Sequence, residues 1–313
     1  MNMGRRNINL GTPKNAQLLG QIKAVLNDLQ EYWPLTLRQI YYQLVAKEYI
    51  ANHKTQYQTL SSVLKQARID GQVAWGAMED RIRTHKDNTG YINAREYIAT
   101  QLYYFLNNYE RNYQIGQEVY LEVWIEKDAL SRIFQNEADK YRVPVQVCRG
   151  YVSVSMLNEY RNRVLQVQQT AVSIGQPVPR PVILYYGDFD PSGNHMFLAT
   201  QQTLEQEIKL RGVEYLREAL NVEDIQAYRL PHSPEALKDK DPRAAQHQAQ
   251  YGNLAVELDA LPPAVLVQKV RQAIERELDP YILQLAQQKE ATEADQIHEL
   301  RREVEKLAQA HGY

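Results

Sequence analysis

Two aspartates in the segment LYYGDFDPSGNHM have the type and spacing of ligands for a hard cation. Asp188 and Asp190 follow an apolar run, Val182 to Tyr186, which is stopped by Gly187. Two carboxylates at positions i and i+2 can share one Mg²⁺ ion, because this ion favours carboxylate and water oxygens and completes its shell with phosphate. The alternative is a solvated turn, since Asp, Pro, Ser and Gly are the residues that turns prefer.

Another carboxylate stands at a comparable place earlier in the chain. Glu126 ends the strand-like run that starts at Val119 in VYLEVWIEKDALSRIF, and a helical pattern follows it. Ligands gather at the carboxyl ends of the strands in a parallel sheet. If the two runs are neighbouring strands, Glu126 converges with Asp188 and Asp190 on an acidic pocket suited to metal-assisted phosphoryl chemistry. The alternative for Glu126 is one half of an exposed pair with Lys127.

Strands and tight turns must hold these carboxylates in place. Short apolar runs rich in β-branched and aromatic residues, bounded by Gly and Pro, are typical of buried strands. A further run of this kind, Val143 to Cys148, is followed by the tight loop Arg149-Gly150-Tyr151 and by a helix that starts between Ser155 and Tyr160. The pattern predicts an α/β domain with a parallel sheet.

The order of these features resembles the Toprim domain. A glutamate follows the first strand, a basic-Gly turn follows the second, and D-x-D-P-x-G follows the third. DFDPSG is most similar to the A subunit of type IIB topoisomerase (topoisomerase VI) and its meiotic double-strand-break relatives. The family's usual lysine in the turn is Arg149 here, and its following proline is replaced by Val152-Ser153. The resemblance implies a Rossmann-like domain that binds Mg²⁺, with Mn²⁺ as a substitute, through Glu126, Asp188 and Asp190.

The N-terminal third is similar to a winged helix. An amphipathic helix is predicted between Leu35 and Ile50, with Thr36 as its N-cap, and a second helix between Gln56 and Ile69. A turn at Asp70-Gly71 and a short apolar stretch follow, where the hairpin of a winged helix would lie. The second helix of such a domain enters a DNA major groove. Basic residues predicted to contact DNA are Lys65, Arg68, Arg81 and Arg83, with Arg149 and Lys238 further along the chain.

The segment RQIYY matches the R-x-x-Y-Y element that carries the catalytic tyrosine of the topoisomerase VI A subunit. The resemblance places the nucleophile at Tyr42, because a tyrosyl oxygen can attack a phosphodiester and form a phosphotyrosyl link. Arg38, one helical turn earlier, would steady a phosphate or the developing phenolate. The alternative for Tyr42 is a structural or DNA-contacting residue, since the chain has 22 tyrosines. Tyr41 falls on the apolar face and is predicted to be a core residue.

A polar segment runs from Arg229 to Ala255 and closes with the sequence VELDAL. A loop that returns to such an element resembles the Toprim-containing A-subunit relatives, including the nuclease subunit of the Wadjet plasmid-defence system. Glu257 is therefore a possible additional carboxylate of the metal pocket. Asp259 is interpreted as an acidic residue near the start of the helix that follows from Ala264.

Composition and charge bound the class of protein. The chain has 313 residues, 44% of them hydrophobic, and its one cysteine, Cys148, is predicted to be buried. It lacks the apolar region of a secretory signal, and no run approaches the ~18 apolar residues of a membrane span. We expect a cytoplasmic protein, in which association with the nucleoid is also allowed. The predicted divisions are a flexible N-terminus (1–14), a winged helix (15–110), a Toprim-like domain (119–261) and a helical C-terminal region (262–313).

Positive charge is biased towards the predicted DNA-binding part. Residues 1–118 carry 14 Lys and Arg against 10 Asp and Glu, whereas the remainder carries 22 against 28. The resemblance implies an Mg²⁺-dependent DNA-cleaving homodimer in which the tyrosine of one chain meets the metal site of the other, with a separate ATPase or complex subunit as partner for strand passage. One alternative is a hydrolytic nuclease of a defence or mobile-element system, with water as nucleophile. The other is a DNA-binding protein without cleavage activity.

Overall fold

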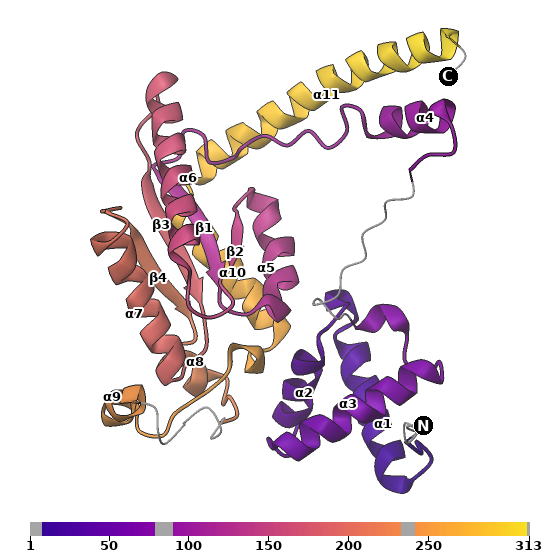
Figure 1. The fold of residues 1–313 in the computed structure, drawn as a ribbon, viewed down its shortest axis with the longest axis vertical. Coiled ribbons are helices and arrows are strands. Elements are labelled where there is room, and N and C mark those ends of the chain that lie inside the picture. Colours follow the sequence, from indigo (N-terminus) through magenta and orange to yellow (C-terminus); the bar gives the residue numbers. More distant parts are fainter. Residues whose placement is uncertain (1–7, 79–89, 233–241, 312–313) are drawn as a thin grey trace.

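The protein contains one parallel four-stranded sheet in the part of the chain that its computed structural model describes, residues 8–78, 90–232 and 242–311 (Figure 1). The strand order is β2-β1-β3-β4. The predicted α/β class is confirmed, although the sequence did not predict the fourth strand. The strand bounds are β1, Val119–Ile125; β2, Val145–Val147; β3, Arg180–Tyr186; and β4, Glu214–Ala219.

Strands β1 and β3 are neighbours and run in register. Val119 pairs with Arg180, and the pairing continues to Ile125 and Tyr186. The carboxyl ends of these two strands therefore lie side by side, so that the residues after them leave the sheet at the same edge.

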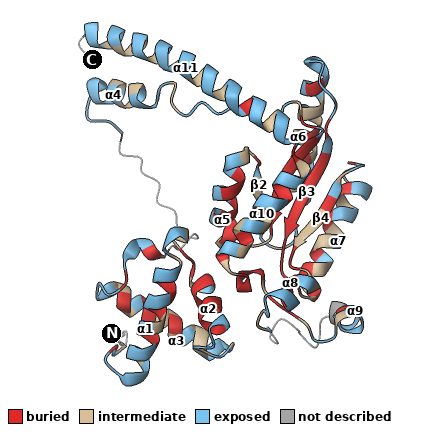
Figure 2. Cartoon of the chain, turned by 180° about the vertical axis from the view of Figure 1, so that it is seen from behind, coloured by how far each residue is buried: buried red, intermediate tan, exposed pale blue. Residues whose placement is uncertain are grey.

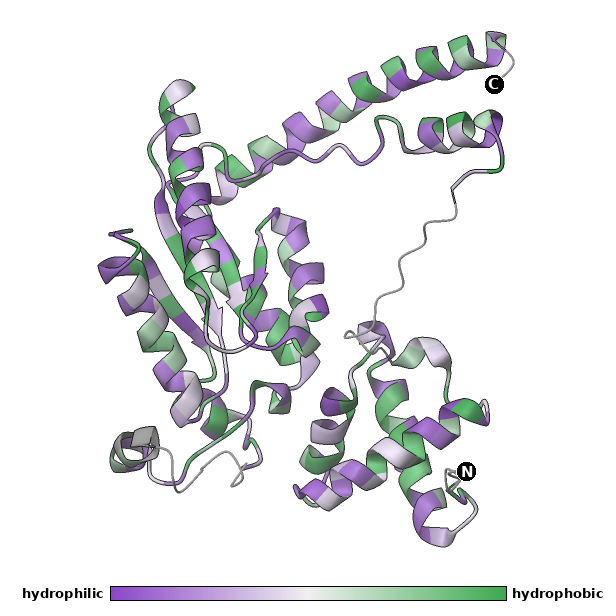
Figure 3. Ribbon diagram, viewed as in Figure 1, coloured by the Kyte–Doolittle hydropathy of each residue, from purple (hydrophilic) through white to green (hydrophobic). Residues whose placement is uncertain are grey.

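Helices cover both faces of the sheet, and both central strands are buried along almost their whole length (Figure 2). On one face Trp124, Ile183 and Tyr185 belong to a core cluster with residues of α6 (Val154–Ser173) and α7 (Pro191–Gln206). The other face packs against α5 (Ser131–Ala138) and α10 (Pro263–Glu277). Burial on both faces explains why β3 is a continuous apolar run from Val182 to Tyr186 and why β1 carries only one charged residue, Glu122; the strands show green segments between paler and purple ones in Figure 3.

The N-terminal unit is built from α1 (Pro13–Asp28), α2 (Leu37–Ala46) and α3 (Lys54–Ile69). Thr36 caps α2 as predicted, and its side chain and that of Gln39 form a reciprocal capping box. These helices confirm the two predicted in this region, within a few residues at their ends.

The wing of the expected winged helix is not established. The apolar stretch after Gly71 contains a 3₁₀ turn, η2 (Trp75–Ala77), and Leu35 forms an isolated parallel bridge with Met78. The residues that follow, 79–89, lie outside the described part of the chain, and so do the predicted DNA contacts Arg81 and Arg83. The winged helix therefore stays a prediction.

The C-terminal region is helical, with a break where Pro280 predicted one. Helix α10 ends at Glu277, and α11 spans Pro280–Ala310. Helix α4 (Ala94–Tyr104) lies beside α11 in Figures 1 and 2, and Arg301 of α11 donates to the carbonyl oxygen of Tyr103. No helix among the described residues has the length and apolarity that a membrane span needs. The shorter elements are η1, Gln30–Tyr32; η3, Asp128–Leu130; η4, Asp139–Tyr141; α8, Val222–Ala227; α9, Pro242–Tyr251; and η6, Leu258–Ala260.

Candidate active site

The sheet brings Glu126 and Asp188 together at the carboxyl ends of β1 and β3. The Glu126 amide donates to the Tyr186 carbonyl (2.9 Å), and the Asp188 amide donates to Glu126 Oε2 (3.0 Å). Gly187 lies between the strand and the aspartate, where a Cβ atom would stand 2.8 Å from Glu126 Oε2. The same Cβ atom would also stand 2.7 Å from the buried Tyr185 ring, so a larger residue at this position would force Tyr185 or Glu126 to shift.

The second aspartate of the D-x-D pattern begins a helix. Asp190 is the N-cap of α7, its Oδ1 accepts from the Gly193 amide (2.6 Å), and Pro191 is the first helical residue. A Cβ atom on Gly193 would collide with the carbonyl oxygen of Asp188. The pattern D-x-D-P-x-G thus fixes a tight turn between strand and helix, with one carboxylate capping the helix and the other directed into the site.

Lys127 lies among three carboxylates instead of forming the exposed pair with Glu126 that the sequence offered as an alternative. Its Nζ is 2.9 Å from Asp188 Oδ1, 2.7 Å from Glu257 Oε2 and 2.8 Å from Asp259 Oδ2, and 12% of its side chain is exposed. Burial opposes the charged amine, but the charges of Asp188, Asp259 and Glu257 raise the pKa of Lys127 well above its usual value. Lys127 is therefore the internal counter-ion of this acidic cluster.

The VELDAL segment reaches the cluster through a two-residue bridge. Phe189 and Val256 exchange backbone hydrogen bonds of 2.9 Å, and the Leu258 amide donates to Asp188 Oδ1 (2.8 Å). Glu257, predicted as a possible further carboxylate, is thereby placed in the cluster. The interpretation of Asp259 as only a helix-start residue is wrong, because its side chain is fully buried 2.8 Å from Lys127 Nζ and neither of its oxygens has an aligned hydrogen-bond donor within the described residues.

Helix α2 contributes two further side chains to the site. Arg38 Nε lies 3.2 Å from Glu257 Oε2, and a hydrogen bond from Tyr42 is among the contacts that lower the pKa of Glu257. Tyr42 is 4% exposed, and its ring packs edge-on against Tyr41 at 5.3 Å. Tyr41 is buried, as predicted for a core residue. The contact between α2 and the acidic cluster is made within one chain, whereas the resemblance implies an arrangement between two chains.

Burial of several carboxylates in one place shifts their proton affinities. Desolvation raises the pKa of Glu126 to about 7, and the charge of Asp188 adds to the shift. Desolvation likewise raises the pKa of Asp188 to about 6, although Lys127 opposes it. In the described part of the chain, Lys127 and Arg38 are the cations that pair with this cluster. The cluster has five carboxylates, those of Glu126, Asp188, Asp190, Glu257 and Asp259. The local charge is therefore negative and suits a further cation.

The donor set fits a hard divalent ion in chemistry, although its side chains are not arranged as a ligand shell. Backbone amides bind one oxygen each of Glu126, Asp188 and Asp190, so these contacts leave the second oxygen of each carboxylate available. Over the described ranges, no three acidic, histidine or cysteine side chains already surround one point as metal ligands. Binding of Mg²⁺ would therefore require rotation of these carboxylates and displacement of the Lys127 amine.

A search against protein-family models and curated proteins found no match. The family assignment therefore rests on the motifs in the sequence and remains a resemblance.

The described DNA-contact candidates lie near a groove next to the acidic cluster. A cavity of about 660 Å³ is lined by Lys65 and Arg68 of α3, by Arg38, and by Asp128 after β1. The Arg68 guanidinium stands 4.6 Å over the Trp75 ring and donates to the carbonyl oxygens of Trp75 and Met78, so that Arg68 also holds the turn after α3. Lys65 is exposed and available for phosphate contact.

The remaining candidate Arg149 occupies the predicted tight loop with a left-handed backbone (φ 49°), and its exposed side chain pairs with Asp128 at 3.2 Å. The turn predicted at Arg149-Gly150 is thus present. Lys238 lies outside the described residues.

The raised pKa values predict that stability depends on pH when no metal is bound. Unfolded carboxyls titrate near pH 4, whereas folded Glu126 and Asp188 keep a proton up to about pH 7 and 6. Between these values the folded state binds more protons, so the free energy of unfolding falls as pH rises from about 4 to 7. We expect the free energy of unfolding of Glu126→Gln to fall less over this pH range, by on the order of 3 kcal/mol, because glutamine does not titrate.

Urea unfolding in chelator at a series of pH values measures this dependence. Glu205→Gln, on the exposed side of α7, is the matched control and should leave the slope unchanged. Equal slopes for Glu126→Gln and the native protein would contradict the assignment of a raised pKa to Glu126.

Proposed function

We propose that this protein cleaves DNA strands in an Mg²⁺-dependent reaction, as its resemblance to the topoisomerase VI A subunit implies. The observation that carries the proposal is the buried acidic cluster at the ends of β1 and β3, which Arg38 and Tyr42 of α2 contact. Such a cluster supplies ligands for a metal that binds phosphate, and the helix beside it supplies a hydroxyl and a guanidinium. DNA is the proposed substrate, and a second copy of the chain is the partner that the resemblance implies.

The carboxylates of Glu126 and Asp188, with Asp190 at the rim, are the proposed ligands of Mg²⁺. When bound there, the ion would neutralise charge on the scissile phosphate and on the leaving oxygen. The pKa of Glu126 is about 7 in the metal-free site, and a bound Mg²⁺ would lower it, so that the carboxylate could accept a proton during the reaction. Glu257 is less suited to this role, because Lys127 and Arg38 help to hold its pKa below the usual value.

Tyr42 is the proposed nucleophile. Its oxygen would form a bond to phosphorus while the bond from phosphorus to the deoxyribose oxygen breaks, and its proton would pass to a carboxylate of the cluster or to water. Arg38 lies one turn earlier on α2 and its positive charge interacts with Tyr42, so it can stabilise the developing phenolate. The energy of the cleaved bond is retained in the phosphotyrosyl link.

Substitution Tyr42→Phe tests this step and should abolish the covalent adduct, because phenylalanine keeps the packing and lacks the attacking oxygen. End-labelled DNA is incubated with protein and Mg²⁺, quenched in denaturant and run on a gel with and without protease digestion. A protease-sensitive, slowly migrating labelled band identifies the adduct. Tyr41→Phe is the matched control, since Tyr41 is the adjacent buried ring, and it should keep the adduct.

A hydrolytic nuclease is the second candidate function, and the burial of Tyr42 favours it. A ring that is 4% exposed and packed against Tyr41 has a sufficient structural role without chemistry. In this case water replaces the tyrosyl oxygen and the metal ligands are unchanged. Free cut fragments with no adduct, equally abundant in the native protein and in Tyr42→Phe, would establish hydrolysis and overturn the role of Tyr42.

Contact with the DNA backbone is expected at Lys65. Removing one lysine that pairs with phosphate should lower affinity about equally for all sequences and reduce the slope of log affinity against log salt by about 1. Fluorescence anisotropy of labelled duplex DNA with Lys65→Ala at several salt concentrations measures this slope. The control Lys14→Ala changes an exposed lysine of α1, and a slope change as large as that of Lys65→Ala would show that the effect is only one of net charge.

A further inference from the structure

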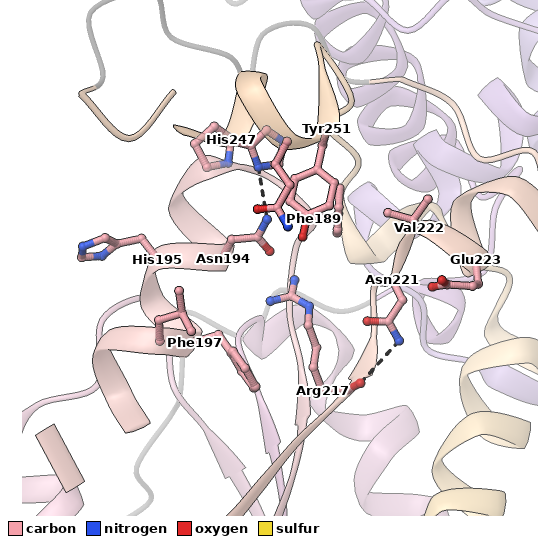
Figure 4. A pocket seen from close by; sticks show the side chains of 13 residues that line it. Phe189, Asn194, His195, Phe197, Arg217, Asn221, Val222, Glu223, His247 and Tyr251 are labelled. Atoms are coloured by element: carbon pink, nitrogen blue, oxygen red, sulfur yellow. Dashed lines mark hydrogen bonds between the residues drawn. The ribbon is translucent and has the colours of Figure 1, made fainter. Parts of the chain in front are cut away.

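A second cavity of about 450 Å³ opens directly beside the acidic cluster (Figure 4). It lies between α7, the end of β4, α8 and α9, and it begins at the residue between the two aspartates, Phe189. Aromatic and aliphatic side chains form about half of its lining: Phe189, Phe197, Tyr251, Pro191, Leu198 and Val222. The walls are thus suited to a flat apolar ring.

Arg217 of β4 projects into this cavity and has unused hydrogen-bonding capacity. Its Nε donates to the Leu220 carbonyl (2.9 Å), and its Nη2 donates to the Asp188 carbonyl (2.5 Å). Its Nη1 is buried and, among the described residues, has no hydrogen-bond partner. Burial lowers the pKa of Arg217, and the described residues provide no carboxylate in ion-pair contact with it. A buried donor without an acceptor is costly, so a ligand that supplies an acceptor would be bound favourably.

Three amides, two histidines and one carboxylate complete the polar lining: Asn194, Asn221, Gln250, His195, His247 and Glu223. Asn194 is oriented by a contact of 3.1 Å with His247 Nδ1, while His247 Nε2 lies 2.7 Å from the Leu254 carbonyl. Asn221 lies across the cavity on the N-terminal side of α8, and beside it stands Glu223, an exposed acid. This carboxylate would repel a phosphate group, whereas amides and a guanidinium match the polar edge of a neutral heterocycle.

We propose that this cavity binds one unpaired nucleobase of the DNA strand held at the acidic cluster, with guanine preferred. The ring would lie against Tyr251 and the part of Phe197 that lines the cavity, since the Phe197 ring also stacks on Tyr215 at 4.6 Å, and its acceptor edge would face Arg217 Nη1. Guanine presents two acceptors, O6 and N7, and arginine is the side chain that most often binds them. Stacking of single-stranded bases on aromatic side chains contributes about 1–3 kcal/mol per base. The inference rests on the proposed function for the presence of DNA at the neighbouring cluster.

The position of Arg217 connects the cavity to that cluster. One nitrogen of its guanidinium holds the Asp188 carbonyl while Nη1 has no partner among the described residues, so a base bound in the cavity that Arg217 lines would lie next to the backbone that carries the candidate metal ligand. In a nucleotide one sugar joins the base to the phosphate, so a base in the cavity would place its phosphate near the acidic cluster. The cavity would therefore fix the register of the strand relative to the cluster.

Synthetic strands that differ in a single base test the proposal. The two probes are a labelled chain of twelve abasic deoxyribose phosphates and the same chain with one central guanine, so that both carry the same phosphates. Anisotropy titrations use the full chain in chelator, which prevents metal-dependent cleavage. We expect the guanine-bearing strand to bind about tenfold more tightly than the abasic strand.

Filling the cavity should remove this preference. Leu198→Trp places a larger ring on the exposed rim, and Val222→Trp fills the cavity from α8 should the first variant leave room. Val178→Trp is the control, since Val178 is exposed outside the cavity lining. We expect the control to keep the tenfold difference and the cavity variants to bind both strands like the abasic one.

Equal affinities of the native protein for the two strands, or no binding of either, would overturn the nucleobase site. The nucleobase site would also be overturned if Leu198→Trp and Val222→Trp, shown to be folded by circular dichroism, both still bound the guanine-bearing strand more tightly than the abasic strand. The experiment separates this inference from the proposed function, because it needs no cleavage. Mg²⁺-dependent cleavage without a preference for the guanine-bearing strand would leave the proposed function standing and exclude the nucleobase site. A preference for that strand without Mg²⁺-dependent cleavage would support the nucleobase site and contradict the proposed function.

Discussion

Replacement of Lys127 by methionine is expected to lower the free energy of unfolding by about 3–5 kcal/mol when no divalent metal is present. The amine lies within 2.9 Å of oxygens from Asp188, Glu257 and Asp259, and it is almost fully buried. Methionine has a similar length but no charge, so the three carboxylates would face one another without their shared partner. Removing one member of a buried ionic cluster is costly because the remaining charges stay desolvated.

Added Mg²⁺ should restore part of the stability of Lys127→Met, and by more than it stabilises the native protein. An ion that binds only the folded state stabilises it in proportion to the logarithm of its concentration over its dissociation constant. In the variant no amine competes for the carboxylates. Urea unfolding in chelator and in millimolar Mg²⁺ measures both effects.

A matched control is Lys140→Met, because Lys140 pairs with Glu137 on α5 but is mostly exposed. Glu137 is buried but also pairs with Arg271 at 2.7 Å, so it keeps a cation in this variant, which should lose less stability than Lys127→Met and should not respond to Mg²⁺. If Lys127→Met lost no more than Lys140→Met, the amine would not be the counter-ion of the cluster. An Mg²⁺ response equal to that of the native protein would mean that metal and amine do not share a site.

The elements that position the site could be predicted because their signals are local. Strands β1 and β3 are buried on both faces, which leaves runs in the sequence that are apolar except for Glu122 in β1 and Arg180 at the start of β3. The start of α2 is set by Thr36 and Gln39, three residues apart, and a capping box is readable at that spacing. Strand β4 lacks such a run, since Arg217 and Glu218 interrupt its apolar residues, and it was missed.

The interior of the cluster could not be predicted because its contacts are long-range. Lys127 and Glu257 are 130 positions apart, and a Glu-Lys pair in sequence looks like exposed surface. The bridge between Phe189 and Val256 brings the VELDAL segment back to the D-x-D turn, and two isolated residues give no pattern of their own. A signal was present at Asp259, which lies between apolar residues, but the same position suits a helix start equally well.

The hydrogen-bond and ion-pair partners of Glu122, a buried acid within β1, could not be predicted from the sequence either. Glu122 lies fully buried within β1, where it accepts hydrogen bonds from Tyr120 (2.6 Å) and Trp124 (2.9 Å) and pairs with Arg163 (2.8 Å) of α6. Nothing in the β1 sequence indicates that the partner, Arg163, is 41 positions away. Local periodicity therefore predicts which residues are strand or helix, while the charge partners of a buried acid follow only from the packing of the elements.

Substitution Asp188→Asn is expected to reduce Mg²⁺-dependent DNA cleavage by about 100- to 1000-fold, the usual loss when a group that stabilises transition-state charge is removed. Asparagine keeps the size of the side chain and an oxygen that can accept from the Leu258 amide, now 2.8 Å from Asp188 Oδ1. It lacks the negative charge that a hard cation needs.

The stability of Asp188→Asn should change far less than its activity. Asp188 is desolvated, and its charge raises the pKa of Glu126, so neutralising it relieves repulsion among the carboxylates even though Lys127 loses one partner. Urea unfolding in chelator should therefore show a smaller loss than Lys127→Met, while the gel assay shows cleavage lost. Asp139→Asn, an exposed aspartate of η4, is the control and should retain both properties. Cleavage by Asp188→Asn within tenfold of the native rate would exclude Asp188 as a metal ligand, and equal loss of stability and activity would indicate that the turn had only been disrupted.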